Sequence, residues 1–305
     1  MGRRLAEFAR GAVKRPDVSP AEAPEAADSD AVKTQKQIAA ILHDRLKHDF
    51  SGYKTAVFLR RVARRMQLLQ IASLDSYIAY LRENTQEPPL LFRDLLIGVT
   101  SFFRDTAAFN ALKSQVIPNL FQNAVQGEAV RIWVPACATG EEAYSLAILL
   151  REHMETMRAP PHVQIFATDI DETAIEFARS GRYHLSELQN VSTERLRRYF
   201  ARDDLHCTIS KDIRDMCVFS QHSVLENPPF SRLDLISCRN LLIYFGTQLQ
   251  ARVLPLFHFA LKPGRYLFLG TSENVSQHPE LFTAIDKKNR IYQRRNSALA
   301  AHRLL

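Results

Sequence analysis

The 305-residue sequence predicts an α/β protein built on a doubly wound parallel sheet. Three observations predict it. Strand-like and helix-like patterns alternate after residue 129, one glycine turn joins the first strand to the first helix, and polar residues follow several strands directly. Right-handed crossovers would bring those strand ends to one edge of the sheet. We therefore expect a ligand site at that edge.

Residues 1–105 are expected to hold a flexible segment and then a small helical domain. Residues 1–32 are rich in Ala, Pro, Asp and Glu and lack hydrophobic periodicity, which predicts a leader or interdomain linker. Residues 33–105 repeat apolar residues at helical spacing. Gly52 is expected to end the first helix, and Pro88-Pro89 a later one.

The second domain is expected to span residues 106–297 and to carry the sheet. Its strands are expected at residues 129–135, 163–168, 216–220, 233–237 and 266–269. Its helices are expected at residues 142–154, 172–179 and 247–261. Residues 281–293 predict a hairpin that closes the sheet, and residues 182–215 a small inserted subdomain. Residues 298–305 would be a tail.

Composition and charge are those of an ordinary globular protein. Hydrophobic residues make up 46% and charged residues 24%, and the net charge of +7 suits an acidic partner. The four cysteines lie far apart without a CxxC pair, which favours a reducing cytoplasm and predicts neither a disulfide nor a metal site. No apolar run approaches the ~20 residues that cross a bilayer, so we expect no membrane insertion.

The turn around Gly140 is the most informative feature of the sequence. An apolar strand runs into Gly140, the carboxylates Glu141 and Glu142 follow at once, and a helix begins. A pyrophosphate site needs bare glycines and helix-terminal N–H groups, and two carboxylates would repel phosphate. The same carboxylates suit a ligand with positive charge and hydroxyls. S-adenosylmethionine, with its sulfonium, ammonium and ribose, is such a ligand.

Polar residues at two further strand ends are candidate ligand contacts. Asp169 ends the second strand, where an acidic side chain accepts hydrogen bonds from ribose hydroxyls in other nucleoside-binding folds. Helix capping is the alternative, with Asp171 as a competing cap. Arg239 and Asn240 end the fourth strand, and Tyr244 follows shortly after. A surface arginine and a core tyrosine are the alternative there.

The linker between the two domains contains Thr100-Ser-Phe-Phe-Arg104. A linker that pairs two aromatic residues with a cation could close over the ligand and bring Arg104 to the substrate. Phe102 and Phe103 are assigned to interdomain packing. Arg104 is therefore the candidate catalytic residue of the linker.

Five motifs occur in order: Thr100-x-Phe-Phe-Arg104, Thr139-Gly-Glu-Glu-x-Tyr-Ser145, Ala167-Thr-Asp-Ile-Asp171, Cys238-Arg-Asn-x-x-Ile-Tyr-Phe245 and Leu261-Lys-Pro-Gly264. Together they closely resemble the CheR family of chemotaxis receptor glutamate methyltransferases, over residues 34–295. Residues 230–245 look most like the CheR-type modules of hybrid signalling proteins. The resemblance implies a Rossmann-like, S-adenosylmethionine-dependent methyltransferase sheet with an N-terminal helical domain and a small inserted β subdomain. It implies methyl transfer to glutamate side chains, forming glutamyl methyl esters.

The resemblance also implies the site residues. Contacts with S-adenosylmethionine would come from Thr100, Arg104, Glu142, Asp169, Ser223, Val224, Cys238 and Arg239. Arg104 and Tyr244 would face the transferring methyl group. Ser223-Val224 stands where the family often has Asn-Leu. Because Asn both donates to and accepts from adenine and Ser223 offers one short hydroxyl, the loop backbone is left to make that contact.

One helix suggests the acceptor. Arg60, Arg61, Arg64 and Arg65 place four guanidinium groups on one helical face, without balancing acids in that helix. This predicts a docking surface for an acidic helical protein, such as the cytoplasmic domain of a chemoreceptor. A solvated helix face is the alternative. Tether-binding members of the family look to carry a glycine-rich loop in the inserted subdomain, and this segment has no glycine, so we expect a tether-independent enzyme.

Two other functions fit part of the sequence. Asn227-Pro-Pro-Phe230 matches a motif of methyltransferases that act on amino groups of nucleic-acid bases. That motif belongs after the fourth strand and here precedes it, so no nucleic-acid partner is expected. The stronger alternative is a non-catalytic regulatory module of a hybrid signalling protein that binds S-adenosylmethionine or its demethylated product. Arg104 and Tyr244 favour the enzyme.

Overall fold

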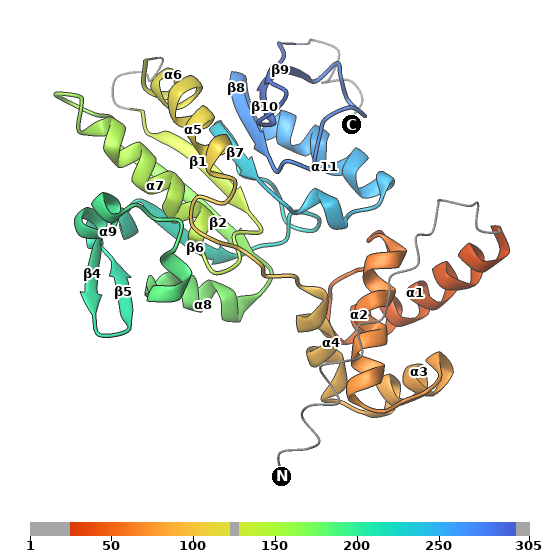
Figure 1. The fold of residues 1–305 in the computed structure, drawn as a ribbon. Helices are drawn as coiled ribbons and strands as arrows, with labels where there is room; N and C mark the ends of the chain where they lie inside the picture. The colour runs from red at the N-terminus through yellow and green to blue at the C-terminus, as the bar shows by residue number, and fades with distance from the viewer. Residues whose placement is uncertain (1–24, 123–127, 297–305) are drawn as a thin grey trace, which may run out of the picture.

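The computed structural model describes residues 25–122 and 128–296, which form a helical domain, a sheet domain and a subdomain inserted in the latter (Figure 1). The helical domain consists of α1 (Glu25–Leu46), α2 (Thr55–Leu68), α3 (Leu74–Glu83) and α4 (Glu87–Leu95). Its core is separate from that of the sheet domain and includes Phe50, Phe58 and Tyr77, all fully buried.

Three expectations for the N-terminal segment were wrong in detail. Residues 25–32, expected in the flexible leader, belong to α1, while residues 1–24 and the expected tail lie outside the described part. α1 ends at Leu46, where Lys47 adopts a positive φ of 58°, and not at Gly52. Pro88 and Pro89 begin α4 instead of ending a helix, because the first turn needs no N–H donor from them.

The sheet has seven strands in the order β6-β2-β1-β7-β8-β10-β9. Its strands are β1 (Val130–Pro135), β2 (Val163–Asp169), β6 (Cys217–Gln221), β7 (Leu233–Cys238), β8 (Leu261–Leu269), β9 (Phe282–Asp286) and β10 (Ile291–Arg294). The first five pair in parallel, and the closing hairpin of β9 and β10 is antiparallel. The predicted fold class is therefore confirmed. β8 begins at Leu261, earlier than the sequence pattern indicated.

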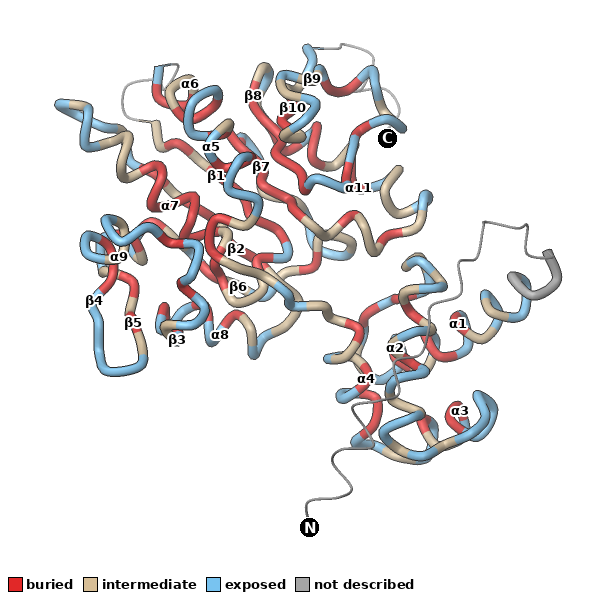
Figure 2. Tube along the Cα trace, in the orientation of Figure 1, coloured by how far each residue is buried: buried red, intermediate tan, exposed pale blue. Residues whose placement is uncertain are grey.

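Helices cover both faces of the sheet, and the central strands lie buried between them (Figure 2). Ile132 and Val134 face a core shared with α5 (Thr106–Gln115), α6 (Ile117–Gln122), α7 (Glu141–Met154) and α8 (Glu172–Ser180). Trp133 points to the opposite face, where its ring lies 5.7 Å from that of Phe257 in α11 (Thr247–Ala260). This alternation is the period of two expected of a strand buried on both sides. Helices α5 and α6 were not predicted.

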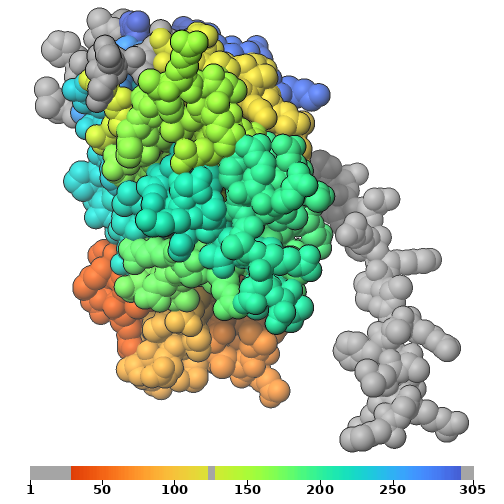
Figure 3. Space-filling view, turned by 90° about the vertical axis from the view of Figure 1, so that its left-hand side faces the viewer, coloured from red at the N-terminus to blue at the C-terminus, as the bar shows by residue number. Residues whose placement is uncertain are grey.

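The inserted subdomain, residues 182–214, follows α8 and holds a three-stranded antiparallel sheet in the order β3-β5-β4. Its elements are β3 (Arg182–His184), the short 3₁₀ helix η1 (Leu185–Leu188), α9 (Thr193–Tyr199), β4 (Phe200–Asp203), β5 (His206–Ile209) and α10 (Lys211–Arg214). Figure 3 shows it, in green to teal, packed against the sheet domain above the orange helical domain. Over the described residues, no helix is long and apolar enough to cross a membrane.

Candidate active site

A pocket of about 1110 Å³, counting its open mouth, lies at the carboxyl edge of the sheet. Its walls come from the loops after β1, β2, β6 and β7, from the interdomain linker and from the helical domain. The sequence-predicted residues that line it are Thr100, Arg104, Glu142, Asp169, Ser223, Val224, Arg239 and Tyr244. The structure therefore brings together side chains from five separate segments, at the edge that the strand ends predicted.

Cys238 does not line the pocket, contrary to expectation. It is the last residue of β7, and its side chain is fully buried in the core on the α11 side. Its neighbour Ser237 lies on the other face and donates a hydrogen bond to Glu142 at 2.6 Å. Because side chains alternate along a strand, only one of these two residues can point toward α7.

The turn after β1 holds its shape through left-handed backbone conformations. Ala136, Ala138 and Gly140 have φ values of 54°, 46° and 95°. A Cβ atom on Gly140 would lie 2.9 Å from that of Ala178, so only glycine fits there. The turn delivers α7 to the pocket with its first residues at the ligand edge.

The two carboxylates that follow Gly140 have different environments. Glu141 accepts hydrogen bonds from the Thr139 hydroxyl, the shorter at 2.7 Å, and does not line the pocket. Glu142 lines the pocket, and burial raises its pKa to about 7, against the lowering effects of Arg239 and Ser237. Near neutral pH this carboxyl is therefore balanced between its protonated and ionised forms.

Asp169 lies in the pocket wall, and Asp171 caps the helix. The Asp169 carboxylate accepts hydrogen bonds from the backbone N–H groups of Ala138 at 2.8 Å and Asp171 at 3.0 Å. Asp171 accepts from the N–H groups of Thr173 and Ala174 at the start of α8. Asp171, and not Asp169, is therefore the cap of α8.

Arg104 and Tyr244 line the same pocket. The Arg104 guanidinium donates to the carbonyl oxygen of Val99 at 2.8 Å. Burial raises the pKa of Tyr244, while the positive charges of Arg104, Arg61 and Arg60 lower it. The phenol therefore stays protonated at neutral pH, and three arginines lie close enough to act on it.

Arg239 is held in a fixed place by contacts on three sides. Its guanidinium lies 5.1 Å from the ring of Phe109 and 4.8 Å from that of Phe268, and its Nη2 donates to Asp105 at 2.7 Å. Its buried Nε and Nη1 have no hydrogen-bond partner among the described residues. These are unsatisfied buried donors on a residue that lines the pocket.

The Asn227-Pro-Pro-Phe230 segment shapes the loop after β6. The Asn227 side chain accepts from the backbone N–H of Ser223 at 2.7 Å, and the Pro228 carbonyl lies 3.0 Å from a ring nitrogen of His222. The Phe230 ring stacks on Phe166 at 4.5 Å. The segment precedes β7, the fourth strand of the large sheet in chain order, so its residues have structural roles.

The helical domain supplies a pocket wall that was not predicted, with His48 and Tyr53. Backbone hydrogen bonds attach it to the loop after β7: the Lys54 N–H donates to the Tyr244 carbonyl and the Gly246 N–H to the Gly52 carbonyl, both at 2.9 Å. No spacing in the sequence connects segments this far apart. The sequence offers one indication of this wall, the closely spaced aromatic residues His48, Phe50 and Tyr53.

The arginines of α2 do not form one exposed row. Arg60 and Arg64 are exposed and Arg61 is half-buried. Arg65 instead binds Glu87 of α4 at 2.7 Å, with side chains 12% and 2% exposed. The acids that balance this charge run come from another helix, which the sequence of α2 alone could not show. Below, the docking surface means Arg60, Arg61 and Arg64.

Comparison with known proteins gives the family. The model described as the CheR methyltransferase SAM-binding domain matches residues 98–291, and the model of the CheR methyltransferase all-alpha domain matches residues 34–96. The chain belongs to the CheR methyltransferase family. It is thus a methyltransferase with an S-adenosylmethionine-binding domain, and the sheet-edge pocket lies between the two family domains.

Relatives of this CheR chain include the chemotaxis protein methyltransferases of Salmonella typhimurium and Escherichia coli. They are 33% and 31% identical over 79% and 81% of this chain, and over 83% and 86% of their own lengths. An uncharacterised 104.1 kDa protein of Rhodobacter capsulatus is 40% identical over 80% of this chain. The chain spans only 26% of that protein.

Proposed function

We propose that this CheR-family protein transfers methyl groups from S-adenosylmethionine to glutamate side chains of a chemoreceptor-type protein in the cytoplasm, forming glutamyl methyl esters. The observation that carries the proposal is one pocket that combines Glu142 and Asp169 with Arg104 and Tyr244. The acids suit the cofactor, and the cation and phenol suit an acidic acceptor. Relatives that are named chemotaxis protein methyltransferases support the same activity.

The pocket lining fits S-adenosylmethionine. Asp169 is held so that its oxygens can accept from ribose hydroxyls. Glu142 offers negative charge to the cationic part, and the unpartnered N–H groups of Arg239 suit the carboxylate. The Ser223 hydroxyl accepts from the Leu225 N–H and keeps its own hydrogen to donate, and Val224 lines the pocket beside it, so both residues can contact adenine.

The transfer itself asks little acid–base chemistry of the protein. S-adenosylmethionine supplies an activated methyl group on its sulfonium. A glutamate acceptor is ionised at neutral pH, with an ordinary pKa of about 4.3, so no general base is needed. Arg104 would orient the acceptor carboxylate and Tyr244 would donate a hydrogen bond to it. Their contribution is alignment and exclusion of water.

The docking surface extends from the pocket over α2. Arg60 and Arg61 lie close enough to Tyr244 to lower its pKa, so their charge reaches a residue that lines the pocket. An acidic helical protein, such as a chemoreceptor cytoplasmic domain, would lie across this surface and present one glutamate to Arg104. The turn between β4 and β5 is Asp204-Leu205, so tether independence stays our prediction.

The test is incubation with methyl-tritiated S-adenosylmethionine and receptor-containing membranes, followed by measurement of the methanol that base releases. We expect base-labile label with the wild-type protein and its loss with Arg104→Ala. Binding of S-adenosylhomocysteine without any label would contradict the proposal. It would favour the alternative, a non-catalytic module of a larger signalling protein; the 104.1 kDa relative is such a longer chain in length alone.

A further inference from the structure

The backbone around Arg104 is held in an uncommon conformation. Phe103 and Asp105, which flank Arg104, have positive φ values of 49° and 58°. Residues with a Cβ atom rarely adopt this region, because Cβ then approaches a carbonyl oxygen. Neighbouring groups must therefore hold both residues in place. The direction of the Arg104 side chain depends on those neighbours.

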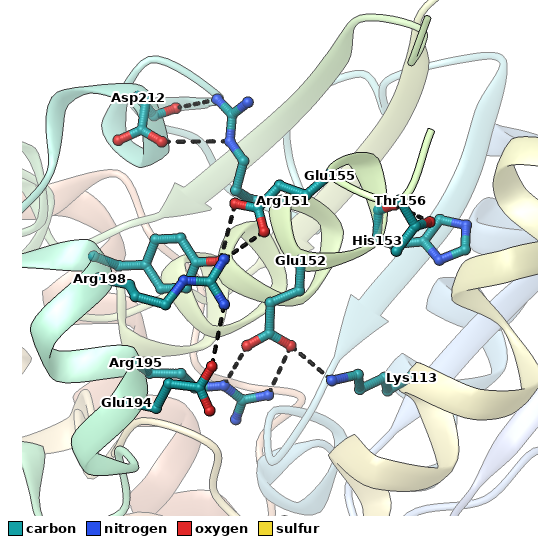
Figure 4. A network of polar contacts seen from close by, with 11 residues as sticks. Lys113, Arg151, Glu152, His153, Glu155, Thr156, Glu194, Arg195, Arg198 and Asp212 are labelled. Carbon is teal, nitrogen blue, oxygen red and sulfur yellow. Dashed lines mark hydrogen bonds and ion pairs between the residues drawn. The ribbon is translucent and has the colours of Figure 1, made fainter. Parts of the chain in front are cut away.

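On the Phe103 side the holding group belongs to the inserted subdomain. The Arg195 guanidinium of α9 lies 4.2 Å from the centroid of the Phe103 ring, and the Phe103 N–H donates to the Ser145 hydroxyl of α7. Arg195 is itself fixed, because its Nε and Nη2 bind the Glu152 carboxylate at 2.7 and 3.1 Å. Lys113 binds the same carboxylate at 2.8 Å, as Figure 4 shows.

Aromatic contacts between the subdomain and the linker add to this. The Phe102 ring lies 4.9 Å from that of Tyr183 in β3 and 5.7 Å from that of Phe200 in β4. The Tyr183 hydroxyl donates to the Thr139 carbonyl at 2.6 Å, in the turn that leads to Glu142. The subdomain thus contacts the linker that carries Arg104 and the turn that leads to Glu142.

We propose that the inserted subdomain braces the catalytic linker and that Arg195 is a positioning residue for Arg104. The inference rests on the proposed methyl transfer for its effect on activity. It gives the subdomain a role that needs no bound peptide. Arg195 does not line the pocket and acts through the Phe103 ring.

The first experiment compares Arg195→Ala with Arg198→Ala by hydrogen exchange of the linker amides in the full chain. Arg198 is a matched control: it lies in the same helix and binds Glu155 and Glu194 (Figure 4), and its ring contact is with Tyr199. We expect exchange at Phe103 to quicken about tenfold in Arg195→Ala and to stay unchanged in Arg198→Ala. Equal exchange in the two variants would overturn the proposal.

Activity separates positioning from plain stabilisation. We expect Arg195→Ala to lower kcat about tenfold while the KM for S-adenosylmethionine changes less than about twofold. Arg195→Lys keeps a charge for Glu152 without the planar stack on Phe103, and so should lie between the two. A fall in protein stability with unchanged kcat would contradict positioning. If the wild type transferred no methyl, the proposed function would fail, yet the exchange comparison would still decide the role of Arg195.

A double-mutant cycle of Arg195→Ala with Phe103→Leu tests whether Arg195 acts on the linker through the Phe103 ring. Leucine keeps the apolar packing and removes the ring face that Arg195 covers. If Arg195 acts through that ring, its substitution should add little to the linker exchange rate once Phe103 is leucine. Fully additive effects would show that Arg195 acts by another path and would overturn the mechanism.

Discussion

At Glu142, burial and local contacts act on one carboxyl group in opposite directions. Removal from water favours the neutral acid, whereas Arg239 and the Ser237 hydroxyl favour the carboxylate. The outcome is a pKa of about 7 at the place where a cationic ligand is expected. Proton binding and cofactor binding should therefore compete at this residue.

We accordingly expect affinity for S-adenosylhomocysteine to increase as the pH rises through about 7, because its ammonium prefers the ionised Glu142. Calorimetric titration from about pH 6 to about pH 8, on both sides of that pKa, measures this. Glu142→Gln should bind more weakly and with little pH dependence. The same slope in both proteins would assign the effect to another group.

The stability of the ligand-free protein should change with pH in the opposite direction to ligand affinity. A carboxyl pKa raised from 4.5 to about 7 means that the folded state keeps a proton that the unfolded state has lost. Glu142 thus contributes stability below its unfolded pKa, and that contribution is lost as the pH rises through about 7. Glu142→Gln should flatten this part of the curve of unfolding free energy against pH.

Arg104 and Tyr244 should differ in the size of their effects on transfer. Arg104→Ala removes a charged donor and should lower kcat by about 10²–10³-fold, whereas Tyr244→Phe removes one neutral hydrogen bond and should cost about tenfold. Initial rates of ester formation measure both. Full turnover by Arg104→Ala, with cofactor binding intact, would remove Arg104 from the mechanism.

Sequence could identify these residues but not always their direction. Glu141 and Glu142 follow the same glycine, yet successive helix residues point about 100° apart, so only one faces the pocket. Cys238 and Ser237 likewise point to opposite faces of the sheet, because side chains alternate along a strand. The expectation that ligands bind where parallel strands end gave the correct edge of the sheet. The side that each side chain takes depends on register with neighbouring elements, which one sequence does not show.

Among helices, α2 gives a clear contrast between two adjacent arginines. Arg65→Ala would leave the buried Glu87 carboxylate without its cation and should cost about 3 kcal/mol of unfolding free energy. Arg64→Ala, at an exposed position, should cost less than about 0.5 kcal/mol. Denaturant unfolding of the two variants measures the difference. Equal stabilities would mean that the Arg65–Glu87 pair is not maintained.

The docking surface should affect acceptor binding more than chemistry. Charge reversal with Arg60→Glu and Arg64→Glu together should raise the KM for an acidic acceptor by about tenfold or more and reduce the salt dependence of the rate. Methylation rates at varied acceptor and salt concentrations test this. An unchanged acceptor KM would mean that these arginines form an ordinary solvated helix face and do not bind the acceptor.

Element prediction succeeded where one pattern dominated and failed where two competed. The strands with continuous apolar runs were found because both of their faces are buried. Pro88 and Pro89 are compatible with a helix end and with a first turn, and the sequence pattern does not separate the two. Gly52 resembles a helix stop signal in the sequence, but it lies in the turn that contacts the Tyr244–Gly246 loop.

For the whole molecule, the interdomain contact should control cofactor binding. His48 of the helical domain lies 3.4 Å from Glu226 of the loop after β6, and burial lowers the pKa of His48 below its usual 6.5. It is therefore neutral at pH 7 and acts as a hydrogen-bonding group. His48→Ala should weaken S-adenosylhomocysteine binding by about fivefold, the effect of one lost hydrogen bond of about 1 kcal/mol.

Calorimetry measures this loss, and Glu226→Gln is the matched variant. It keeps an acceptor for His48 and should bind the ligand nearly as the wild type does. Unchanged affinity in His48→Ala would show that the helical wall does not contribute to the cofactor site.

The loop after β7 that contacts Gly52 and Lys54 is synthesised long after these two residues. The helical domain leaves the ribosome first, while the loop that will cover its aromatic side is still unmade. The Tyr53 ring lies 5.2 Å from that of Phe245, and at about 5–20 residues per second it waits roughly 10 to 40 seconds for Phe245 to emerge. Through that interval the nascent domain depends on its own core. The wall that later encloses the cofactor is then a surface that a chaperone can reach.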